Sequence, residues 1–397
     1  MSRALATAGL LALISFGCGA RTGLFVDPIE PMDAGPDAEA PVDGGPVPVD
    51  APIDGGCADL RHERITTAVD VLFIIDDSGS MAEEQEALVS AFSYMASAFA
   101  SGDIDGDGEP EFASVADLHI GVVTSDLGSF AEAEDGFSLS PRSCGDSRPW
   151  GNDGVLRDGC GLARPWVSYR EGQSVDRFSR DFACLARVGT EGCGFEMPLE
   201  AGLKALTPST SEIRFAGGTV GHADGANAGF LRPDSLLAII VLSDEDDRSV
   251  ANARFREAIT EEERHTGTAW LHPYERYVEG FRALREDPDQ LVFAAIAGLP
   301  TDLVPEAGEV LDVDAALADP RMEIVYDEFD PVHIVASCEA EGVGRATPPR
   351  RLVEVAGAFG ERALVHSICR DDYRAPLQLI AERVGEAITR TWCADGL

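Results

Sequence analysis

Short runs of consecutive apolar residues, many of them β-branched, recur along the chain and end at polar or turn-forming residues. Uninterrupted runs of this length are typical of strands that are buried on both faces of a parallel sheet. We expect strands over residues 68–75, 118–124, 236–242, 291–297 and 364–368.

Between these runs, apolar residues return at intervals of three or four. Leu88, Phe92, Met95 and Phe99 show this spacing, which predicts a helix over residues 81–99 with one apolar face. We also expect helices over residues 199–206, over part of 254–285 and over 375–392. Alternating strands and helices predict an α/β fold: a Rossmann-like, mostly parallel sheet flanked by helices.

The first 17 residues differ from the rest. A basic start precedes an apolar stretch, residues 4–17, which is shorter than the about 20 residues needed to span a bilayer. It has the length of a signal-peptide core. Followed by Cys18, it resembles a bacterial lipoprotein signal, which implies lipidation of Cys18 and an outer-membrane location, periplasmic or surface-exposed. The alternative is ordinary cleavage and a free exported protein.

Residues 18–60 are expected to form a disordered tether. Seven prolines lie between residues 26 and 56, among Asp, Gly and Ala, and no Lys or Arg occurs there. Such a segment cannot bury enough apolar surface to offset the entropy lost on ordering. Residues 61–397 are expected to form the folded domain.

Nine cysteines support an exported protein, where disulfides are the default. If Cys18 carries lipid, eight remain. Ranked by spacing along the chain, the expected pairs are Cys144–Cys160, Cys184–Cys193 and Cys338–Cys369, which leaves Cys57–Cys393.

The charge narrows the range of partners. Seventy acidic residues against 31 basic ones give a formal net charge of −39. Nucleic-acid binding depends largely on phosphate neutralisation by basic side chains, so no nucleic-acid partner is expected. A polybasic attachment to anionic lipid is excluded on the same ground, so membrane contact is expected through the lipid anchor only.

Two predicted strands end in acids and hydroxyls. The first is followed by Asp76, Ser78 and Ser80, and the second by Asp244. In open α/β sheets, ligands bind beyond the carboxyl ends of the strands. Carboxylate and hydroxyl oxygens are the ligands that Mg²⁺ and Ca²⁺ prefer. The sequence therefore predicts a divalent-metal site at this edge.

The segment VLFIIDDSGSM resembles the first strand and loop of a von Willebrand factor type A domain. Its D-x-S-x-S signature, at Asp76, Ser78 and Ser80, resembles that family's metal-ion-dependent adhesion site, and AIIVLSDEDD resembles the later strand that supplies an aspartate, here Asp244. A third loop of the family usually offers a threonine. Gly194 stands at that position, so Thr190, Glu196 or a water molecule is the candidate substitute.

The resemblance implies a protein-binding module and no enzyme. Mg²⁺ or Ca²⁺ is the implied cofactor, with Mn²⁺ as a further candidate. A partner protein would supply an acidic residue to complete the metal's coordination. Two alternatives stay open. One is a metal-assisted hydrolase that uses Asp246 and Asp247 for a second metal, although no common hydrolase or phosphate-loop motif occurs. The other is a structural lipoprotein with an empty site.

Long insertions are expected near residues 140–194, 250–288 and 301–349. The first contains four cysteines and is expected to lie near the metal edge, either carrying specificity or only stabilising the fold.

A second candidate site is the segment beginning at Asp103, which resembles a Ca²⁺ loop with acids at alternate positions, Asp103, Asp105 and Asp107. An EF-hand would have a glutamate at the twelfth position, where this chain has Ser114. Glu109 or Glu111 is the candidate to replace it. The alternative is an acidic turn.

Overall fold

The computed structural model describes residues 60–64, 66, 68–130, 149–251, 270–306, 309–327 and 333–393. The chain divides into two units, Met1–Gly56 and Cys57–Leu397, and all of these residues belong to the second. The predicted signal peptide, nearly all of the predicted tether, and the cysteines Cys18, Cys57 and Cys144 lie outside the described residues.

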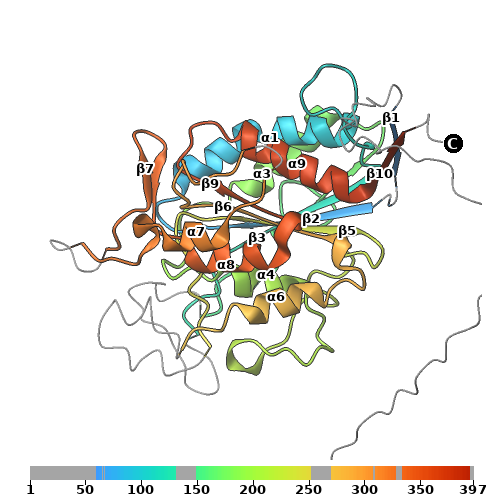
Figure 1. The fold of residues 1–397 in the computed structure, drawn as a ribbon. Coiled ribbons are helices and arrows are strands. Elements are labelled where there is room, and N and C mark those ends of the chain that lie inside the picture. The colour runs from blue at the N-terminus through green and yellow to red at the C-terminus, as the bar shows by residue number, and fades with distance from the viewer. Residues whose placement is uncertain are drawn as a thin grey trace, which may run out of the picture. The chain divides into compact units, whose positions relative to one another are not determined.

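The central element is a six-stranded sheet with the order β4-β3-β2-β5-β6-β9 (Figure 1). All neighbouring strands are parallel except β4, which runs antiparallel to β3. The strand bounds are β2 Ala68–Ile75, β3 Asp117–Thr124, β4 Val167–Arg170, β5 Leu236–Leu242, β6 Leu291–Ala297 and β9 Ala363–Ser367. The predicted α/β class and mostly parallel sheet are confirmed.

Helices cover both faces of this sheet (Figure 1). One face packs against α1 Ala82–Ser101, α3 Val175–Ala186 and α9 Arg374–Ile388. The other packs against α4 Pro198–Leu206, α6 Glu275–Arg282, α7 Val313–Ala318 and α8 Arg350–Phe359. Side chains of β2 alternate between the two layers, with Phe73 on the first side and Ile74 on the second, because successive strand residues point to opposite faces.

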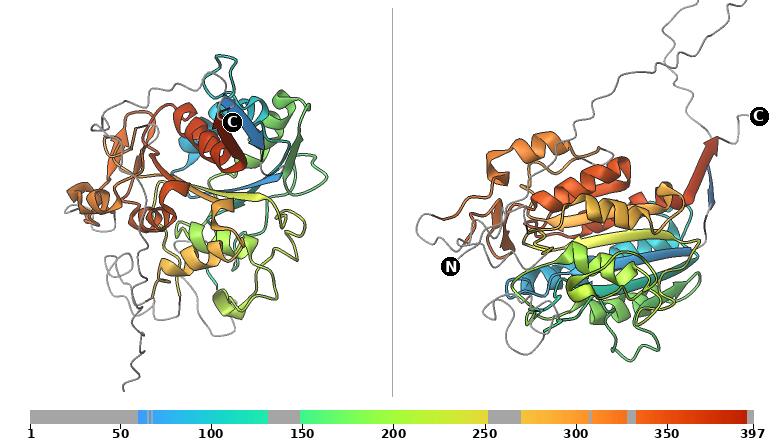
Figure 2. Two further views of the ribbon diagram at one scale, coloured as in Figure 1. Left: turned by 45° about the vertical axis from the view of Figure 1, so that its right-hand side comes forward. Right: turned by 90° about the horizontal axis from the view of Figure 1, so that it is seen from below.

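Two small sheets complete the described fold. β1 Leu60–Arg64 pairs antiparallel with β10 Thr389–Cys393, and the pair stands apart from the main sheet (Figure 2). β7 Cys338–Ala340 and β8 Gly344–Ala346 form a hairpin. Short 3₁₀ turns lie at Ala216–Gly218, Pro288–Gln290, Pro320–Met322 and Gly360–Arg362.

The C-terminal helix is shorter than predicted. The expected helix over residues 375–392 ends at Ile388, and residues 389–393 form β10 instead. Thr389, Thr391 and Trp392 belong to the β-branched and aromatic residues that favour strands, and β1 supplies a pairing partner that periodicity along one segment cannot reveal.

The disulfide prediction is partly wrong. Cys338–Cys369 is confirmed, but Cys160 bonds to Cys184, which rules out both Cys144–Cys160 and Cys184–Cys193. Cys193 is also disulfide-bonded. Spacing along the chain is a poor guide here, because α3 folds back beside β4. This brings Cys184 of α3 to Cys160, in the segment that precedes β4. The predicted Cys57–Cys393 pair lies outside the described residues, since these do not include Cys57.

Within the described residues, no helix is both long and apolar enough to cross a membrane.

Candidate metal centre

The predicted metal residues lie together at one edge of the sheet. β2 and β5 are adjacent and parallel, with Ile75 opposite Leu242, so the residues that follow each strand meet at their carboxyl ends. The backbone N–H of Asp76 donates to the carbonyl of Leu242 at 2.9 Å, which continues the pairing beyond the last strand residues. We call this edge, with Asp76, Ser78, Ser80 and Asp244, the metal rim.

Asp76 is fully buried and held by hydroxyl and amide donors. Its Oδ1 accepts from the N–H of Ser78 at 2.8 Å and from the hydroxyl of Ser125 at 3.2 Å. Its Oδ2 accepts from the hydroxyl of Ser243 at 2.6 Å. Donors from the ends of β2, β3 and β5 therefore fix the orientation of this carboxylate.

The other rim residues, Ser78, Ser80 and Asp244, have fewer hydrogen bonds than Asp76. The hydroxyl oxygens of Ser78 and Ser80 are 3.4 Å apart. Asp244 is only 4% exposed, yet its Oδ1 has no hydrogen-bond partner in the part of the chain that the structure describes. A buried carboxylate oxygen without a donor is costly, and a cation bound beside it removes that cost. Gly79 and Ser80 are exposed, so the rim opens to solvent at that point.

The loop of residues 187–197 packs against the rim. Gly192 N–H donates to the carbonyl of Asp77 at 2.8 Å, and a Cβ at position 192 would lie 2.3 Å from Asp77 Oδ1, so only glycine allows this approach. Gln85 joins the two loops, because its Nε2 donates to the carbonyls of Asp76 at 3.1 Å and Gly189 at 2.9 Å. Thr190, half-buried, lies between Gly189 and Gly192 of this loop.

Glu196, the other predicted substitute ligand, lies in the same loop but forms an ion pair with Arg248. Its backbone carbonyl also accepts from the N–H of Arg248 at 2.9 Å. These contacts tie the loop to the segment after β5. Glu196 Oε1 is nevertheless buried with no hydrogen-bond partner among the described residues, so Glu196 stays a candidate ligand beside Thr190.

The rim is strongly acidic. Burial, together with the repulsion of neighbouring carboxylates, raises the pKa of Asp77, Glu84 and Asp244 to about 7 in each case. The second-largest cause is Asp126 for Asp77, and Asp76 for Asp244. Carboxylates crowded in this way resist ionisation unless a positive charge lies among them.

The insertion of residues 301–349 reaches this edge. Thr347, which follows the β7–β8 hairpin, donates its N–H to the carbonyl of Asp244 at 2.8 Å. Gly344 of the hairpin lies against Glu84, since a Cβ there would come 2.1 Å from Glu84 Oε1. The Cys338–Cys369 disulfide joins the hairpin to the segment after β9.

Part of the first insertion also reaches the rim, as expected. The amide of Asn152 donates to Asp77 Oδ2 at 3.1 Å and to Thr124 Oγ1 at 2.8 Å. Trp166 and Tyr169 of the same insertion lie at the β4 edge of the sheet instead.

Asp246 and Asp247, the acids considered for a second metal, are engaged elsewhere. Asp246 accepts from the N–H groups of Arg351 and Leu352 at the start of α8. Asp247 accepts from the N–H of Leu199 at 3.0 Å and forms an ion pair with Arg351. Asp246 therefore accepts hydrogen bonds from the first turn of α8, and Asp247 from the first turn of α4. The free N–H groups at the start of a helix stabilise a carboxylate there.

Sequence reasoning missed several residues of the rim, namely Ser125, Ser243, Gln85 and Glu84. The signal for Ser125 was present, because β3 ends in polar residues just as β2 and β5 do. Gln85 and Glu84 gave no such signal, since a polar residue in the first turn of a helix is ordinary.

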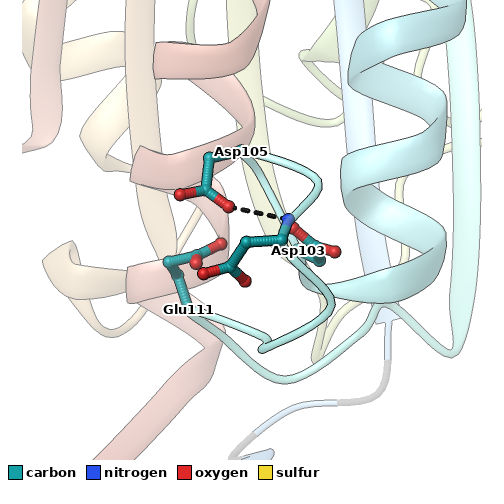
Figure 3. A group of neighbouring side chains, drawn as sticks. Asp103, Asp105 and Glu111 are labelled. Carbon is teal, nitrogen blue, oxygen red and sulfur yellow. Dashed lines mark hydrogen bonds between the residues drawn. The ribbon is translucent and has the colours of Figure 1, made fainter.

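The acidic loop after α1 forms a second group able to bind a metal ion. One carboxylate oxygen from each of Asp103, Asp105, Asp107 and Glu111 lies within 4.8 Å of the others (Figure 3). Glu111 completes the group, not Glu109, and its Oε2 also accepts from the N–H of Ile104 at 2.6 Å. Asp103 Oδ1 accepts from the N–H of Gly106 at 2.6 Å, which fixes the turn.

Comparison with known proteins does not identify a family. No family model matches the chain, and no curated protein matches it. A solved structure of proximal thread matrix protein 1 from the mussel byssus matches at a TM-score of 0.32 and 11% identity. The match covers 81% of this chain and 49% of that one, so the chain spans about half the length of that protein.

Proposed function

We propose that this chain is a metal-dependent protein-binding module of the von Willebrand factor type A kind. Asp76, Ser78, Ser80 and Asp244 would hold a divalent cation, directly or through water. Thr190 and Glu196 are further candidates. A carboxylate of a partner protein would complete the coordination at the exposed side of Ser80. No catalytic step is assigned to the chain.

The buried Oδ1 of Asp244, which has no hydrogen-bond donor among the described residues, is the observation that carries this proposal. It lies beside Asp76 on the neighbouring strand, at the edge where two serine hydroxyls also converge. Mg²⁺ binds few carboxylates and keeps exchangeable waters, so two acids and two hydroxyls leave it able to accept a ligand from outside. Ca²⁺ and Mn²⁺ accept the same oxygen donors.

We further propose that the module acts at the cell envelope, anchored through lipid on Cys18 and held away from the membrane by residues 18–60. The support comes from the sequence alone: an apolar leader, a cysteine directly after it, and a segment rich in Pro, Asp and Gly. An extended segment of this composition spans about 3 Å per residue.

A peptide selection tests the binding function. The purified full-length chain is immobilised and exposed to a displayed library of random linear peptides in millimolar Mg²⁺, and bound peptides are released with chelator. We expect the released peptides to share an Asp or Glu and to lose binding to Asp244→Asn. Asp289→Asn, an exposed change near the opposite end of the sheet, should bind as the wild type does.

A lack of chelator-released peptides, or equal binding by Asp244→Asn, would argue against metal-dependent binding and for the structural alternative. Hydrolysis of bound peptides, followed by mass spectrometry, would instead support the hydrolase.

We also propose that the group of Asp103, Asp105, Asp107 and Glu111 binds Ca²⁺. A matched pair of variants tests it by calorimetric Ca²⁺ titration in the Asp244→Asn background, where the rim no longer contributes. Glu111→Gln should weaken the remaining Ca²⁺ affinity by about tenfold or more, since affinity follows the number of charged ligands. Glu109→Gln should leave it unchanged. Equal effects of the two changes would contradict the assignment.

A further inference from the structure

A groove runs along the β4 edge of the sheet, between that strand and α3. It has a volume of about 450 Å³ and is lined by residues that include Arg164, Trp166, Ser168, Ser174, Arg177 and Phe178. Trp166 and Phe178 are buried and supply an apolar floor. A volume of this size lies in the range of binding clefts.

The groove is directed away from the metal rim. Ser168, which lines the groove, lies opposite His119, the third residue of β3. The rim lies beyond Thr124, the last residue of that strand. A ligand in this groove would therefore lie near the amino end of β3 and would not need the metal.

The outer edge of β4 is available for backbone pairing at Ser168. β4 is the last strand on its side of the described sheet. The backbone N–H of Arg170 donates to Gln173 Oε1 at 3.0 Å, and its carbonyl accepts from the N–H of Gln173 at 2.9 Å. Because Gln173 lies outside β3, both backbone groups of Arg170 point away from that strand. In an antiparallel pair, alternate residues face the same way, so the N–H and carbonyl of Ser168 also point outward. Such groups can pair with an added strand.

The lining of the groove contains two arginines, Arg164 and Arg177, and one acid, Asp181. Its net charge is therefore positive, whereas the chain as a whole carries −39. The exposed guanidinium of Arg164 stacks on Trp166 at 5.3 Å and forms no ion pair with any described residue. Among the described residues Arg177 forms an ion pair only with Asp181, at 3.7 Å, and its side chain is 79% exposed. An exposed pair at this distance contributes little, so both cations can receive a carboxylate from outside.

Two further features suit the groove for binding. The Cys160–Cys184 disulfide joins the segment that leads into Arg164 to α3, so the two walls of the groove are covalently connected. The buried indole N–H of Trp166 has no hydrogen-bond partner among the described residues. Because the disulfide fixes the two walls before binding, less entropy is lost when a ligand binds between them. The indole N–H is a donor that a ligand can use.

We propose that the groove between β4 and α3 binds an extended, acidic segment of a protein partner. The segment pairs with the backbone of Ser168 as an added strand and places carboxylates at Arg164 and Arg177. This site is separate from the metal rim and does not depend on the function proposed for it.

The peptide selection described above, repeated in chelator throughout, tests the proposal on the full-length chain. We expect peptides that combine Asp or Glu with strand-forming residues such as Val, Ile and Thr. The double variant Arg164→Glu/Arg177→Glu should weaken their binding by about tenfold or more, because charge complementarity at the site is reversed. Arg180→Glu reverses one charge on the exposed side of α3, outside the groove, and should have no effect.

A second pair of variants separates backbone pairing from side-chain contact. Ser168→Pro removes the outward N–H, which an edge strand tolerates, and should weaken binding by about tenfold. Ser168→Ala keeps the N–H and should bind normally. Melting temperatures close to that of the wild type confirm that each variant is folded. The proposal is overturned if no peptide binds in chelator, or if bound peptides lack acids and tolerate both arginine changes.

Discussion

Asp244→Asn is expected to abolish the thermal stabilisation that Mg²⁺ or Ca²⁺ gives to the wild-type chain. A ligand that binds only the native state at 100 times its dissociation constant adds about 2.7 kcal/mol to the free energy of unfolding. The variant keeps the size of the side chain but removes one of the two charges that face the cation. Melting curves of both proteins, with saturating metal and with chelator, measure the difference.

In chelator the same variant is expected to be more stable than the wild type. The wild-type carboxylate is 4% exposed, has one oxygen without a donor, and lies beside Asp76. One pKa unit corresponds to about 1.4 kcal/mol, so removing this charge should raise the free energy of unfolding by about 1–3 kcal/mol. A structural aspartate would behave in the opposite way, because its loss would destabilise the protein with or without metal.

Asp289→Asn is the matched control for both measurements. Asp289 has an exposed side chain, lies just before β6 at the amino end of that strand, and has Arg362 at 3.8 Å as its ion-pair partner. It should respond to metal as the wild type does. An equal metal-induced shift in Asp244→Asn and the wild type would refute the ligand assignment.

The metal-free protein is expected to become more stable as the pH falls from 8 to 6.5. Burial raises the pKa of Asp77, Glu84 and Asp244 to about 7. In this window the native state takes up protons while the same groups in the unfolded chain, with ordinary pKa values near 4, stay ionised. Native stability therefore increases on acidification, by about 1–2 kcal/mol over the window.

Below pH 6.5 buried histidines oppose this trend. Burial lowers the pKa of His272 and of His366 to about 4, so between pH 6.5 and 4 the unfolded chain takes up protons that the native state does not. Their contribution to stability is present above pH 6.5 and is lost as the pH falls towards 4. The stability of the metal-free protein should therefore rise less steeply below pH 6.5, or fall.

Chemical denaturation at pH 8, 7.25 and 6.5, with and without saturating Mg²⁺, measures the effect. With bound metal the rim carboxylates are expected to stay ionised, so the response between pH 8 and 6.5 should disappear. Asp244→Asn in chelator should show a smaller response than the wild type. A chelated wild-type protein whose stability is constant over this window would show that the rim carboxylates are not crowded as described.

The central strands could be predicted because their signal is local. The apolar runs at 236–242 and 291–297 match β5 and β6 residue for residue, since a strand buried on both faces needs no alternating polar positions. β4 was missed because it has four residues, of which Ser168 and Arg170 are exposed. Pairing with β3 stabilises it, and its own sequence carries little information about that partner.

The acidic loop after α1 was also only partly predictable, because its sequence does not show which glutamate folds back onto the aspartates. Its aspartates follow one another at alternate positions, so their convergence was predicted. Glu109 and Glu111 were equivalent candidates in the sequence. In the structure Glu111 is the fourth acid of the group. The hydrogen bond between Asp103 and Gly106 fixes the turn, and the Glu111 side chain lies back against the N–H of Ile104.

The sequence by itself determined the α/β class, the ends of the buried strands, and the oxygen-bearing residues that follow β2 and β5. These follow from apolar periodicity and from the rule that parallel strands share one carboxyl edge. Only the tertiary structure decided which distant segments surround that edge, namely the β7–β8 hairpin and the loop of residues 187–197, whose close approach requires Gly192. It also decided the Cys160–Cys184 pairing and the open edge of β4. The physical reason is that these contacts join residues far apart in the chain, where local pattern carries no information about which partner is near.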